Sequence, residues 1–354
     1  MSAAKITIEA IELLKQLISI ESFSTQENKT ADAIENFFSK HSIKTFRKGN
    51  NIWAKNKNFD PASPTLLLNS HHDTVSPNAG WTLNPFEPII KDEKIFGLGS
   101  NDAGASLVSL IAAFIYFDSK EVLKYNLILA ATAEEENSGS GGVETIRSET
   151  GKIDCIIVGE PTEMKMAVAE KGLMVLDCIA KGKSGHAARN IGENAILNAM
   201  KDIEWIHSYN FPKVSETLGS VKMACTIINA GSLHNVIPDT CKFTVDVRTT
   251  DAYTNEEVLE IIKKNIKSKI VPRSSGLQSS GIDKKHILVQ AAKKLGIEIF
   301  GSATSSDMAL WKVPAVKMGP GKSERSHTAD EFIFLKEIEE GTSIYIKLIE
   351  HLVK

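Results

Sequence analysis

Four apolar segments of this chain each end in a histidine or an acid, and this pattern restricts the fold more than any other sequence feature. The segments read LLLNSHHD (66–73), KIFGLGSND (94–102), LILAATAEEE (127–136) and CIIVGEP (155–161). Short apolar runs bounded by turn residues are typical of buried strands. Functional groups of open α/β sheets gather beyond the carboxyl ends of the strands, so we expect these four ends to lie together.

Helical patterns alternate with the apolar runs. Apolar residues recur at helical spacing over 7–20, and Ser24 and Glu27 have the spacing of a capping box for a second helix that ends near His41. Buried strands are expected at 65–70, 126–133 and 155–160. This alternation predicts an α/β fold with a mixed, mostly parallel sheet.

The pattern changes after Pro161. A strand, a helix, two strands and a helix are expected at 166–180, 193–208, 221–230, 240–249 and 254–268. The Ser/Gly-rich stretch 274–281 is typical of a linker, and the α/β pattern then resumes with a helix near 283–295. We therefore predict a discontinuous catalytic domain of 1–165 and 276–354 with an inserted α+β domain of 166–275, and a chain of 354 residues is long enough for two domains.

Composition excludes several kinds of partner and location. The net charge is −3 and no Lys/Arg tract occurs, which argues against nucleic acid and anionic membranes and leaves a small molecule or a protein. The start MSAAKITIEA has no apolar signal core, so we expect a cytoplasmic protein. The run ASLVSLIAAFIYF is too short to span a bilayer and predicts a buried helix. The four scattered cysteines predict reduced thiols.

The residue types at the strand ends favour a metal site. Imidazole and carboxylate ligands together suit zinc and related divalent ions. His71 and Asp73 point the same way in an extended chain and His72 points the other way, so Asp73 can hold the His71 ring. A single acid at a strand end is commonly a turn residue or a helix cap. The coincidence of four such ends, and the mutual repulsion of three glutamates directly after an apolar strand, favour bound cations.

The chain also resembles the M20 metallopeptidase family. The motifs that carry the resemblance are SHHDTV (70–75), GLGSND (97–102), TAEEE (132–136), VGEPT (158–162), GKSGHAA (182–188), VDVRTT (245–250) and SHTADE (326–331). They stand in family order over essentially the whole chain. The resemblance implies a zinc-binding α/β domain with an inserted lid domain that forms a homodimer.

The resemblance assigns a role to each site residue. It implies two divalent ions, zinc or alternatively Co²⁺, with Asp102 as the bridging ligand. The terminal ligands would be His71 and Glu160 for one ion and Glu136 and His327 for the other. Glu135 would be the general base, with Asp73 behind His71. The register of Glu134–Glu136 rests on Thr132 and the family pattern T-x-x-E-E.

Three further residues come from the expected insert. The resemblance implies that His186 stabilises the oxyanion from the partner subunit, that Asn235 works beside it, and that Arg248 binds the substrate carboxylate. An ordinary ion pair within a strand explains Arg248 equally well. Many members of the family carry Lys in a D-x-K-G pattern, whereas this chain reads Asp102-Ala103-Gly104, which indicates a distinct subgroup.

The predicted activity is hydrolysis of an N-acyl amino acid. SSDMAL (305–310) and KMGPGKSERSHTADE (317–331) look most like the acetylornithine deacetylase-like branch, so N-acetylornithine, N-acetylcitrulline and N-succinylcitrulline are the expected substrates, in arginine biosynthesis. A dipeptidase or general aminoacylase would use the same metal site, and a metal-stabilised binding protein would lack turnover. Arg189, Lys322 and Arg325 are candidates to meet an acidic acyl group.

Overall fold

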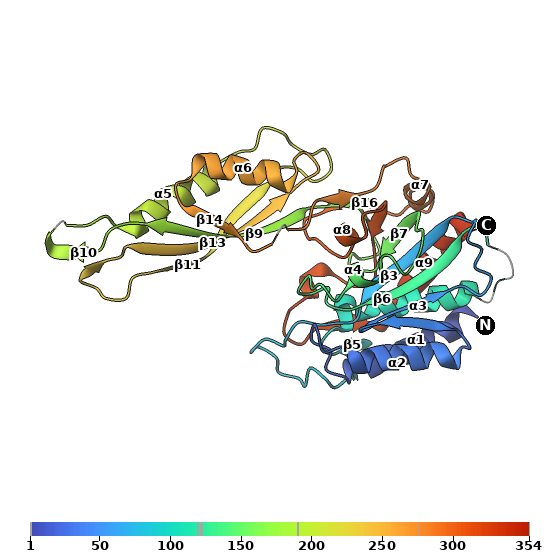
Figure 1. Cartoon of the computed structure of the whole chain (residues 1–354). Helices are drawn as coiled ribbons and strands as arrows, with labels where there is room; N and C mark the ends of the chain where they lie inside the picture. The colour runs from blue at the N-terminus through green and yellow to red at the C-terminus, as the bar shows by residue number, and fades with distance from the viewer. Residues whose placement is uncertain (1, 119, 121–122, 190, 275, 354) are drawn as a thin grey trace. The chain divides into compact units, whose positions relative to one another are not determined.

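The chain divides into two compact units. The computed structural model describes residues 2–118, 120, 123–189, 191–274 and 276–353 (Figure 1). The first unit comprises Met1–Val168, Gly281–Phe300 and Ser306–Lys354, and the second comprises Ala169–Ser280 and Gly301–Ser305. The short return of 301–305 to the second unit was not part of the sequence-based division. Ser275, within the expected linker, lies outside the described residues.

A mixed, mostly parallel sheet forms the centre of the first unit. Its strands lie in the order β1-β2-β6-β3-β7-β17-β8. Their bounds are β1 (Thr45–Lys48), β2 (Asn51–Lys55), β6 (Asn126–Thr132), β3 (Thr65–His71), β7 (Cys155–Val158), β17 (Ala315–Lys317) and β8 (Met166–Glu170). The neighbours β6, β3, β7 and β17 are parallel, while β1, β2 and β8 pair antiparallel. The predicted α/β fold with a mostly parallel sheet is therefore confirmed.

Helices cover both faces of this sheet. The larger apolar cluster joins one face to α1 (Ala3–Ile18), α2 (Asn28–Lys40), α3 (Ala105–Asp118), α7 (Ile287–Lys294) and α9 (Leu335–Val353). The smaller cluster joins the other face to α4 (Val143–Ile146) and α8 (Met308–Trp311). Every residue of β3 and β6 is buried, as expected of strands covered on both sides.

Helix α3 is apolar around its whole circumference. The stretch Ser100–Asp118 is long and apolar enough to cross a membrane, but 83% of its most apolar window is buried inside the protein. It contacts α1 and α9, as the core helix of a globular domain does. The buried helix predicted for this run is confirmed.

The second unit is an antiparallel sheet with two helices on one face. The strand order is β11-β13-β9-β14, with bounds β11 (Lys222–Ala230), β13 (Thr240–Thr249), β9 (Gly172–Lys181) and β14 (Lys269–Pro272). Helices α5 (Ala195–Ser208) and α6 (Asn255–Asn265) pack on it through an apolar cluster. The expected strand 166–180 is broken at Lys171 into β8 and β9, and α6 ends earlier than expected because the chain turns into β14.

One predicted cap is wrong. Helix α2 begins at Asn28, and its N-cap residue Glu27 makes no side-chain capping bond. The hydroxyl of Ser24 donates instead to Asp73 Oδ2 at 2.7 Å, 49 residues further along the chain. The Ser24 hydroxyl therefore bonds to a residue distant in sequence and not to the start of α2, as a capping box would require. The four cysteines are free thiols.

Candidate metal centre

Three neighbouring parallel strands end at the same edge of the first unit's sheet. His71 is the last residue of β3 and is paired with Thr132, the last residue of β6. Strand β7 ends at Val158, which pairs with Asn69 of β3, and Glu160 follows two residues later. The register therefore places the side chains that follow these strands beside one another. This is the arrangement expected from the strand-end pattern.

Asp102 reaches the same edge from the turn before α3. The peptide bond between Asp102 and Ala103 is cis. The buried carboxylate of Glu331 accepts backbone hydrogen bonds from Asn101 at 2.7 Å, Asp102 at 2.9 Å and Gly99 at 3.2 Å. One side chain from a distant loop thus fixes the backbone that presents Asp102. Sequence reasoning quoted Glu331 within the SHTADE motif but gave it no role.

His71 faces two carboxylates through one ring nitrogen. Its Nε2 lies 3.4 Å from Asp102 Oδ1 and 3.6 Å from Glu160 Oε1. Its Nδ1 lies 3.0 Å from the carbonyl oxygen of Asp73 and 3.5 Å from Asp73 Oδ1. A proton on Nδ1 donated to that carbonyl leaves the lone pair of Nε2 directed at the acids. The backbone oxygen of Asp73, as well as its carboxylate, therefore orients the ring.

His72 points away from the acids, as the alternation of an extended chain requires. Its Nδ1 lies 2.9 Å from the Thr30 hydroxyl and its Nε2 lies 2.9 Å from the Asn50 carbonyl oxygen. Burial lowers the pKa of His72 to about 4, so the ring is neutral at physiological pH. Its two nitrogens are both engaged, which leaves none for a ligand role.

Glu136 and His327 form the other half of the cluster. His327 Nε2 lies 3.0 Å from Glu136 Oε2 and 3.7 Å from Asp102 Oδ2. The two oxygens of Asp102 therefore face two different histidines, His71 through Oδ1 and His327 through Oδ2. A carboxylate placed in this way can offer one oxygen to each of two ions. The loop of His327 precedes β18 (Phe332–Phe334), and the turn of Asp102 follows β5 (Lys94–Phe96). These two strands pair in a three-stranded sheet with β4 (Ile89–Lys91), which brings the loop and the turn together.

The donor set fits divalent cations. His71 Nε2 and Glu160 Oε1 are buried and have no hydrogen-bond partner, which is costly unless another group satisfies them. Two ligands at about 2.0–2.1 Å from a tetrahedral zinc ion lie about 3.3 Å apart, close to the separations around His71. Within the described residues, the ligand atoms of His71, Asp102 and Glu136, and those of His71, Glu135 and Glu160, lie within 4.8 Å of one another. The first of these groups joins His71, an implied ligand of one ion, to Glu136, an implied ligand of the other ion.

The glutamates after β6 separate into two directions. Glu134 has a positive φ of 56°, and its carboxylate accepts the backbone N–H of Gly141 at 2.9 Å, away from the cluster. The N–H groups of Glu135 and Glu136 each donate to Asp73 at 3.1 Å, and their carboxylates reach the cluster. The geometry thus agrees with the register that puts the two functional glutamates at 135 and 136.

The charges of the cluster favour neutralisation by cations. Burial, and then the charge of Asp102, raise the pKa of Glu160 to about 8. Burial is also the largest cause of the pKa of Glu135 lying well above its usual range, and the carboxylates of Glu160, Asp307 and Glu136 add to it. Carboxylates crowded in this way are stable in the ionised form only when positive charge lies among them.

Asp307 is a second buried acid that sequence reasoning did not single out. Its Oδ2 accepts a 2.6 Å hydrogen bond from the Thr132 hydroxyl, at the last residue of β6. Asp307 stands in the motif SSDMAL, so its place in that motif was the available signal. Its charge acts on Glu135, and its hydrogen bond ties the start of α8 to the strand that precedes the glutamates.

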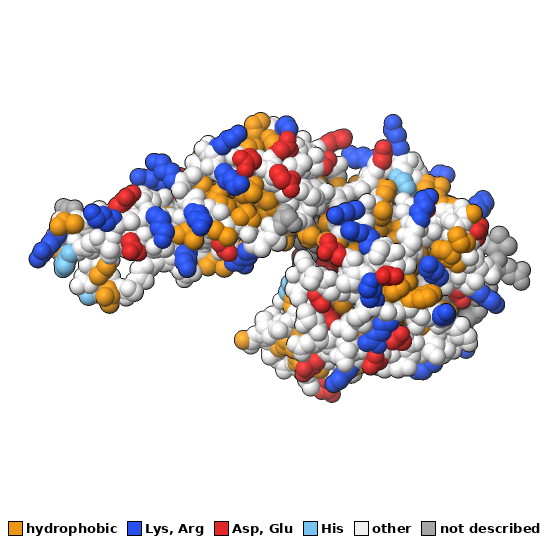
Figure 2. Space-filling view, viewed as in Figure 1, with side chains coloured by type: hydrophobic (Ala, Val, Ile, Leu, Met, Phe, Trp, Pro, Cys, Tyr) orange, Lys and Arg blue, Asp and Glu red, His pale blue; other side chains and the backbone are white. Residues whose placement is uncertain are grey.

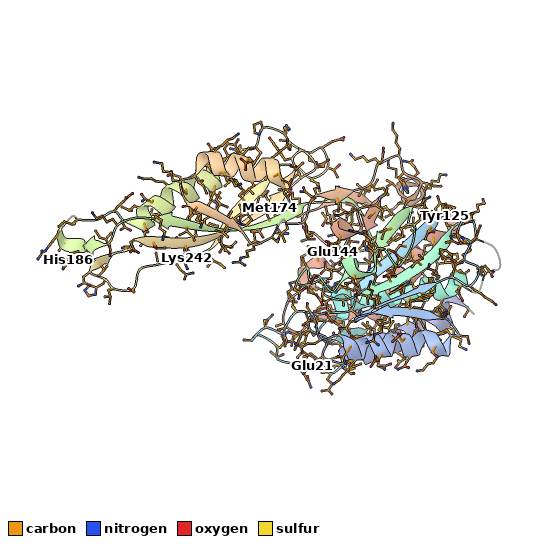
Figure 3. All side chains as sticks on the ribbon, viewed as in Figure 1. Glu21, Tyr125, Glu144, Met174, His186 and Lys242 are labelled. Carbon is orange, nitrogen blue, oxygen red and sulfur yellow. The ribbon has the colours of Figure 1, made fainter. Side chains whose placement is uncertain are left out.

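Three predicted site residues belong to the second unit. His186 in β10 (Gly185–His186) lies beside β12 (Val236–Ile237), and the N–H of Ala187 donates to the Asn235 carbonyl at 3.0 Å. Figure 3 labels His186 at the tip of this unit, with its side chain exposed. Arg248 makes a two-pronged ion pair with Asp246 of its own strand, at 2.8 and 3.0 Å. The ordinary strand ion pair is therefore present, and the substrate role of Arg248 stays a prediction.

Two of the basic residues considered for an acidic acyl group already have partners. Lys322 Nζ lies 3.3 Å from Glu163, and Arg325 Nη1 lies 2.6 Å from Glu337. The Arg325 guanidinium also stacks on Phe332, 4.6 Å from the ring centroid. Arg189 is exposed in the second unit. The geometry weakens the case for Lys322 and Arg325 as acyl-group ligands.

Comparison with known proteins identifies a family model and relatives that span the chain. The model described as peptidase family M20/M25/M40 matches residues 67–351. The [LysW]-lysine/[LysW]-ornithine hydrolase of Sulfurisphaera tokodaii is 30% identical over 352 residues, covering 96% of this chain and 95% of that protein. An acetylornithine deacetylase of Buchnera aphidicola is 27% identical over 379 residues, covering 96% and 97%.

Solved structures match the same overall fold. The M20 family metallo-carboxypeptidase from Sulfolobus solfataricus superposes with a TM-score of 0.78 at 18% identity, covering 97% of this chain and 99% of the other. A dinuclear metal binding peptidase of the M20 family from Bacillus subtilis superposes with a TM-score of 0.72 at 16% identity, covering 98% of each chain. At these identities the structures support the fold alone.

Proposed function

The chain belongs to peptidase family M20/M25/M40 and is a metal-dependent hydrolase of that family, and on this premise we propose that it cleaves the amide bond of an N-acyl derivative of ornithine or a closely related amino acid. The observation that carries the proposal is the cluster of two histidines and three acids around Asp102, in which His71 Nε2 and Glu160 Oε1 are buried without a partner. Two buried polar atoms without a partner are unfavourable unless another group, such as a cation, satisfies them.

Two cations would share the cluster through Asp102. His71 and Glu160 would hold one ion, and Glu136 and His327 the other. Imidazole and carboxylate donors suit zinc, and they accept Co²⁺ as an alternative. When bound, the ions supply Lewis acidity at the amide carbonyl and lower the pKa of water towards neutrality.

Glu135 would move the proton in the reaction. Its carboxylate lies with His71 and Glu160 inside the cluster, and its backbone is fixed by Asp73. It accepts the proton of the attacking water as the carbon–oxygen bond forms. It then delivers that proton to the amine nitrogen as the carbon–nitrogen bond breaks. Asp73 keeps the His71 ring in the orientation that directs Nε2 at the acids.

The second unit would supply the remaining groups through a homodimer. Strand β11 is an edge of its sheet, and Ile227 and Ile228 on it are 48% and 51% exposed. Figure 2 shows apolar side chains on the surface of this unit. An open edge with exposed apolar residues is suited to pairing with the same edge of a second copy. In that dimer, His186 of one copy would stabilise the oxyanion in the other, with Asn235 beside it and Arg248 on the substrate carboxylate.

The proposed substrate follows from the names of two relatives. Both the Sulfurisphaera hydrolase and the Buchnera deacetylase act on a compound that contains ornithine. N-acetylornithine is thus the first substrate to test, followed by N-acetylcitrulline and N-succinylcitrulline. Turnover of these compounds would give the enzyme a role in arginine biosynthesis in the cytoplasm.

An activity panel on the metal-loaded protein tests this choice. The panel contains N-acetylornithine, N-acetylcitrulline, N-succinylornithine, N-succinylcitrulline, succinyl-diaminopimelate and simple dipeptides. We expect kcat/KM for an acylated ornithine or citrulline to exceed that for any dipeptide by at least about tenfold, because differences of a few polar contacts have that size. Faster cleavage of dipeptides would make the enzyme a dipeptidase. Absence of turnover of every compound with metals bound would contradict the proposed substrates.

A further inference from the structure

A cavity of the first unit that lies apart from the metal centre is lined by lysines. Its volume is about 490 Å³, and it is formed by the turn between α2 and β1, the segment after β2 and the end of α3. Lys44, Lys55, Lys57 and Lys120 line it together with Asp118. Cavities of about 300–1,000 Å³ are typical of small-molecule sites. This one contains none of the residues of the metal centre.

Three of the four lysines, all except Lys57, are placed by aromatic rings rather than by acids. The ammonium nitrogens of Lys44, Lys55 and Lys120 lie 5.3, 4.7 and 4.4 Å from the ring centroids of Phe46, Phe59 and Tyr116. Within the part of the chain that the structure describes, no carboxylate oxygen lies within 4.0 Å of any of the four ammonium groups. A ring face orients a lysine without neutralising it, so their charges remain available to a ligand.

The acidic groups around the cavity are already engaged. Asp118 Oδ1 accepts the backbone N–H of Lys57 at 2.7 Å. His41, which also lines the cavity, lies 3.2 Å from Glu9 through its Nε2. The described lysines and Asp118 give the lining a charge of about +3 at neutral pH, in a chain whose net charge is −3. This concentration of like charge gives the cavity a positive potential that attracts anions.

The cavity and the metal centre lie at opposite ends of the same elements. Asn56 in the cavity pairs with Leu127 near the start of β6, whereas the glutamates follow the end of β6 at Thr132. Five residues of strand at about 3.3 Å each give a separation of about 17 Å. Helix α3 runs from the turn of Asp102 to Asp118, and its 14 residues span about 21 Å. In Figure 1 the end of α3 at Asp118 lies on the side of the first unit that carries the C-terminus of the chain.

We propose that this cavity binds a small polyanion of the phosphate class, such as pyrophosphate or a phosphate ester, at a site separate from the metal centre. An ammonium group is a compact charge that binds phosphate oxygens well, and a polyanion can contact several at once. The aromatic rings hold the stems of Lys44, Lys55 and Lys120 in place, which reduces the entropy lost on binding.

Calorimetric titration of pyrophosphate into the metal-loaded protein tests the proposal. Besides any binding to the cations of the metal centre, we expect a site whose affinity falls as salt rises from about 50 to 300 mM. The double variant Lys55→Ala/Lys57→Ala should bind at least about tenfold more weakly, since two charge contacts are lost. Lys48→Ala is the matched control, because Lys48 lies on β1 outside the cavity and pairs with Glu149 at 2.7 Å. Its affinity should change by less than about twofold.

A local measurement separates this site from the metal centre, where pyrophosphate can also bind cations. Lysines are acetylated with and without pyrophosphate and quantified by mass spectrometry, and we expect protection of Lys55 and Lys57 but not of Lys48. Hydrolysis by the double variant should equal that of the wild type and serves as the folding check, with Lys120→Gln as a second variant. Unprotected cavity lysines, or equal affinity in the lysine variants, would overturn the proposal.

Discussion

Glu135 is the single residue on which the proposed reaction depends most. Its carboxylate lies among the candidate ligands, while that of Glu134, one residue earlier, caps the loop at Gly141. We expect Glu135→Gln to lower kcat by at least about 100-fold, because the amide cannot carry the proton. Its metal content should equal that of the wild type.

Glu134→Gln is the matched control for this change. The amide oxygen can still accept the Gly141 N–H, so activity should stay within about threefold of the wild type. Steady-state kinetics and metal analysis of both variants give the answer. A metal-loaded Glu135→Gln enzyme with near wild-type kcat would remove Glu135 from the mechanism.

The sequence predicted the site residues that lie at or just after the ends of the sheet strands. His71 ends a strand, and Glu160 and the run of three glutamates follow strands, whose local apolar pattern is clear, and their convergence follows from the common edge of parallel strands. The family resemblance was needed to choose Glu136 within the glutamate run. His327 came only from the family resemblance, because it lies in a loop that the chain reaches much later. Glu331 and Asp307 were missed as participants because their roles are contacts to distant groups, Asp102 and Thr132, that no local pattern encodes.

The turn that precedes α3 is the element that determines where Asp102 points. Glu331 accepts three of its backbone N–H groups, and burial, together with the charge of Asp102, raises the pKa of Glu331 to about 8. We expect Glu331→Gln to weaken metal binding by about 10–100-fold, since its amide group would place a donor against a backbone donor. Competition with a chelator of known affinity measures the change.

The exposed Glu324 of the same loop region provides the control for this substitution. Glu324→Gln makes the same change from carboxyl to amide without touching the turn, so its metal affinity should match that of the wild type. Equal affinities for Glu331→Gln and the wild type would show that the turn keeps its shape without the carboxylate.

Elements with a strong local pattern were predicted to within a few residues. The fully buried strands β3, β6 and β7 and the apolar helix α3 belong to this group. The errors occur where contacts between residues distant in sequence determine the local structure. Strand 166–180 is broken at Lys171, whose N–H donates to Ser302 and whose Nζ donates to Ser220. The Ser24 hydroxyl was assigned to a local cap, but it donates to Asp73.

At the scale of the whole molecule, the proposed dimer makes each active site depend on two chains. Heterodimers of Glu135→Gln and His186→Ala chains can be purified through two different tags. If His186 acts on the partner, one of the two sites is intact and activity is about half that of the wild type. If His186 acts within its own chain, both sites are defective and no activity returns.

The homodimers of the two variants serve as controls, and both should be inactive. Light scattering of the purified wild type should give twice the chain mass of 38.7 kDa. A monomer of full activity would contradict the dimer and the assignment of His186 to a partner site together.

Removal of the metal ions tests the central claim most directly. The protein is dialysed against a strong chelator until less than about 0.1 ion per chain remains, and hydrolysis of the best substrate of the panel is measured as zinc is returned. The cluster around Asp102 predicts loss of activity on removal and full recovery at two equivalents of zinc per chain. Full activity in the metal-free protein would contradict the account.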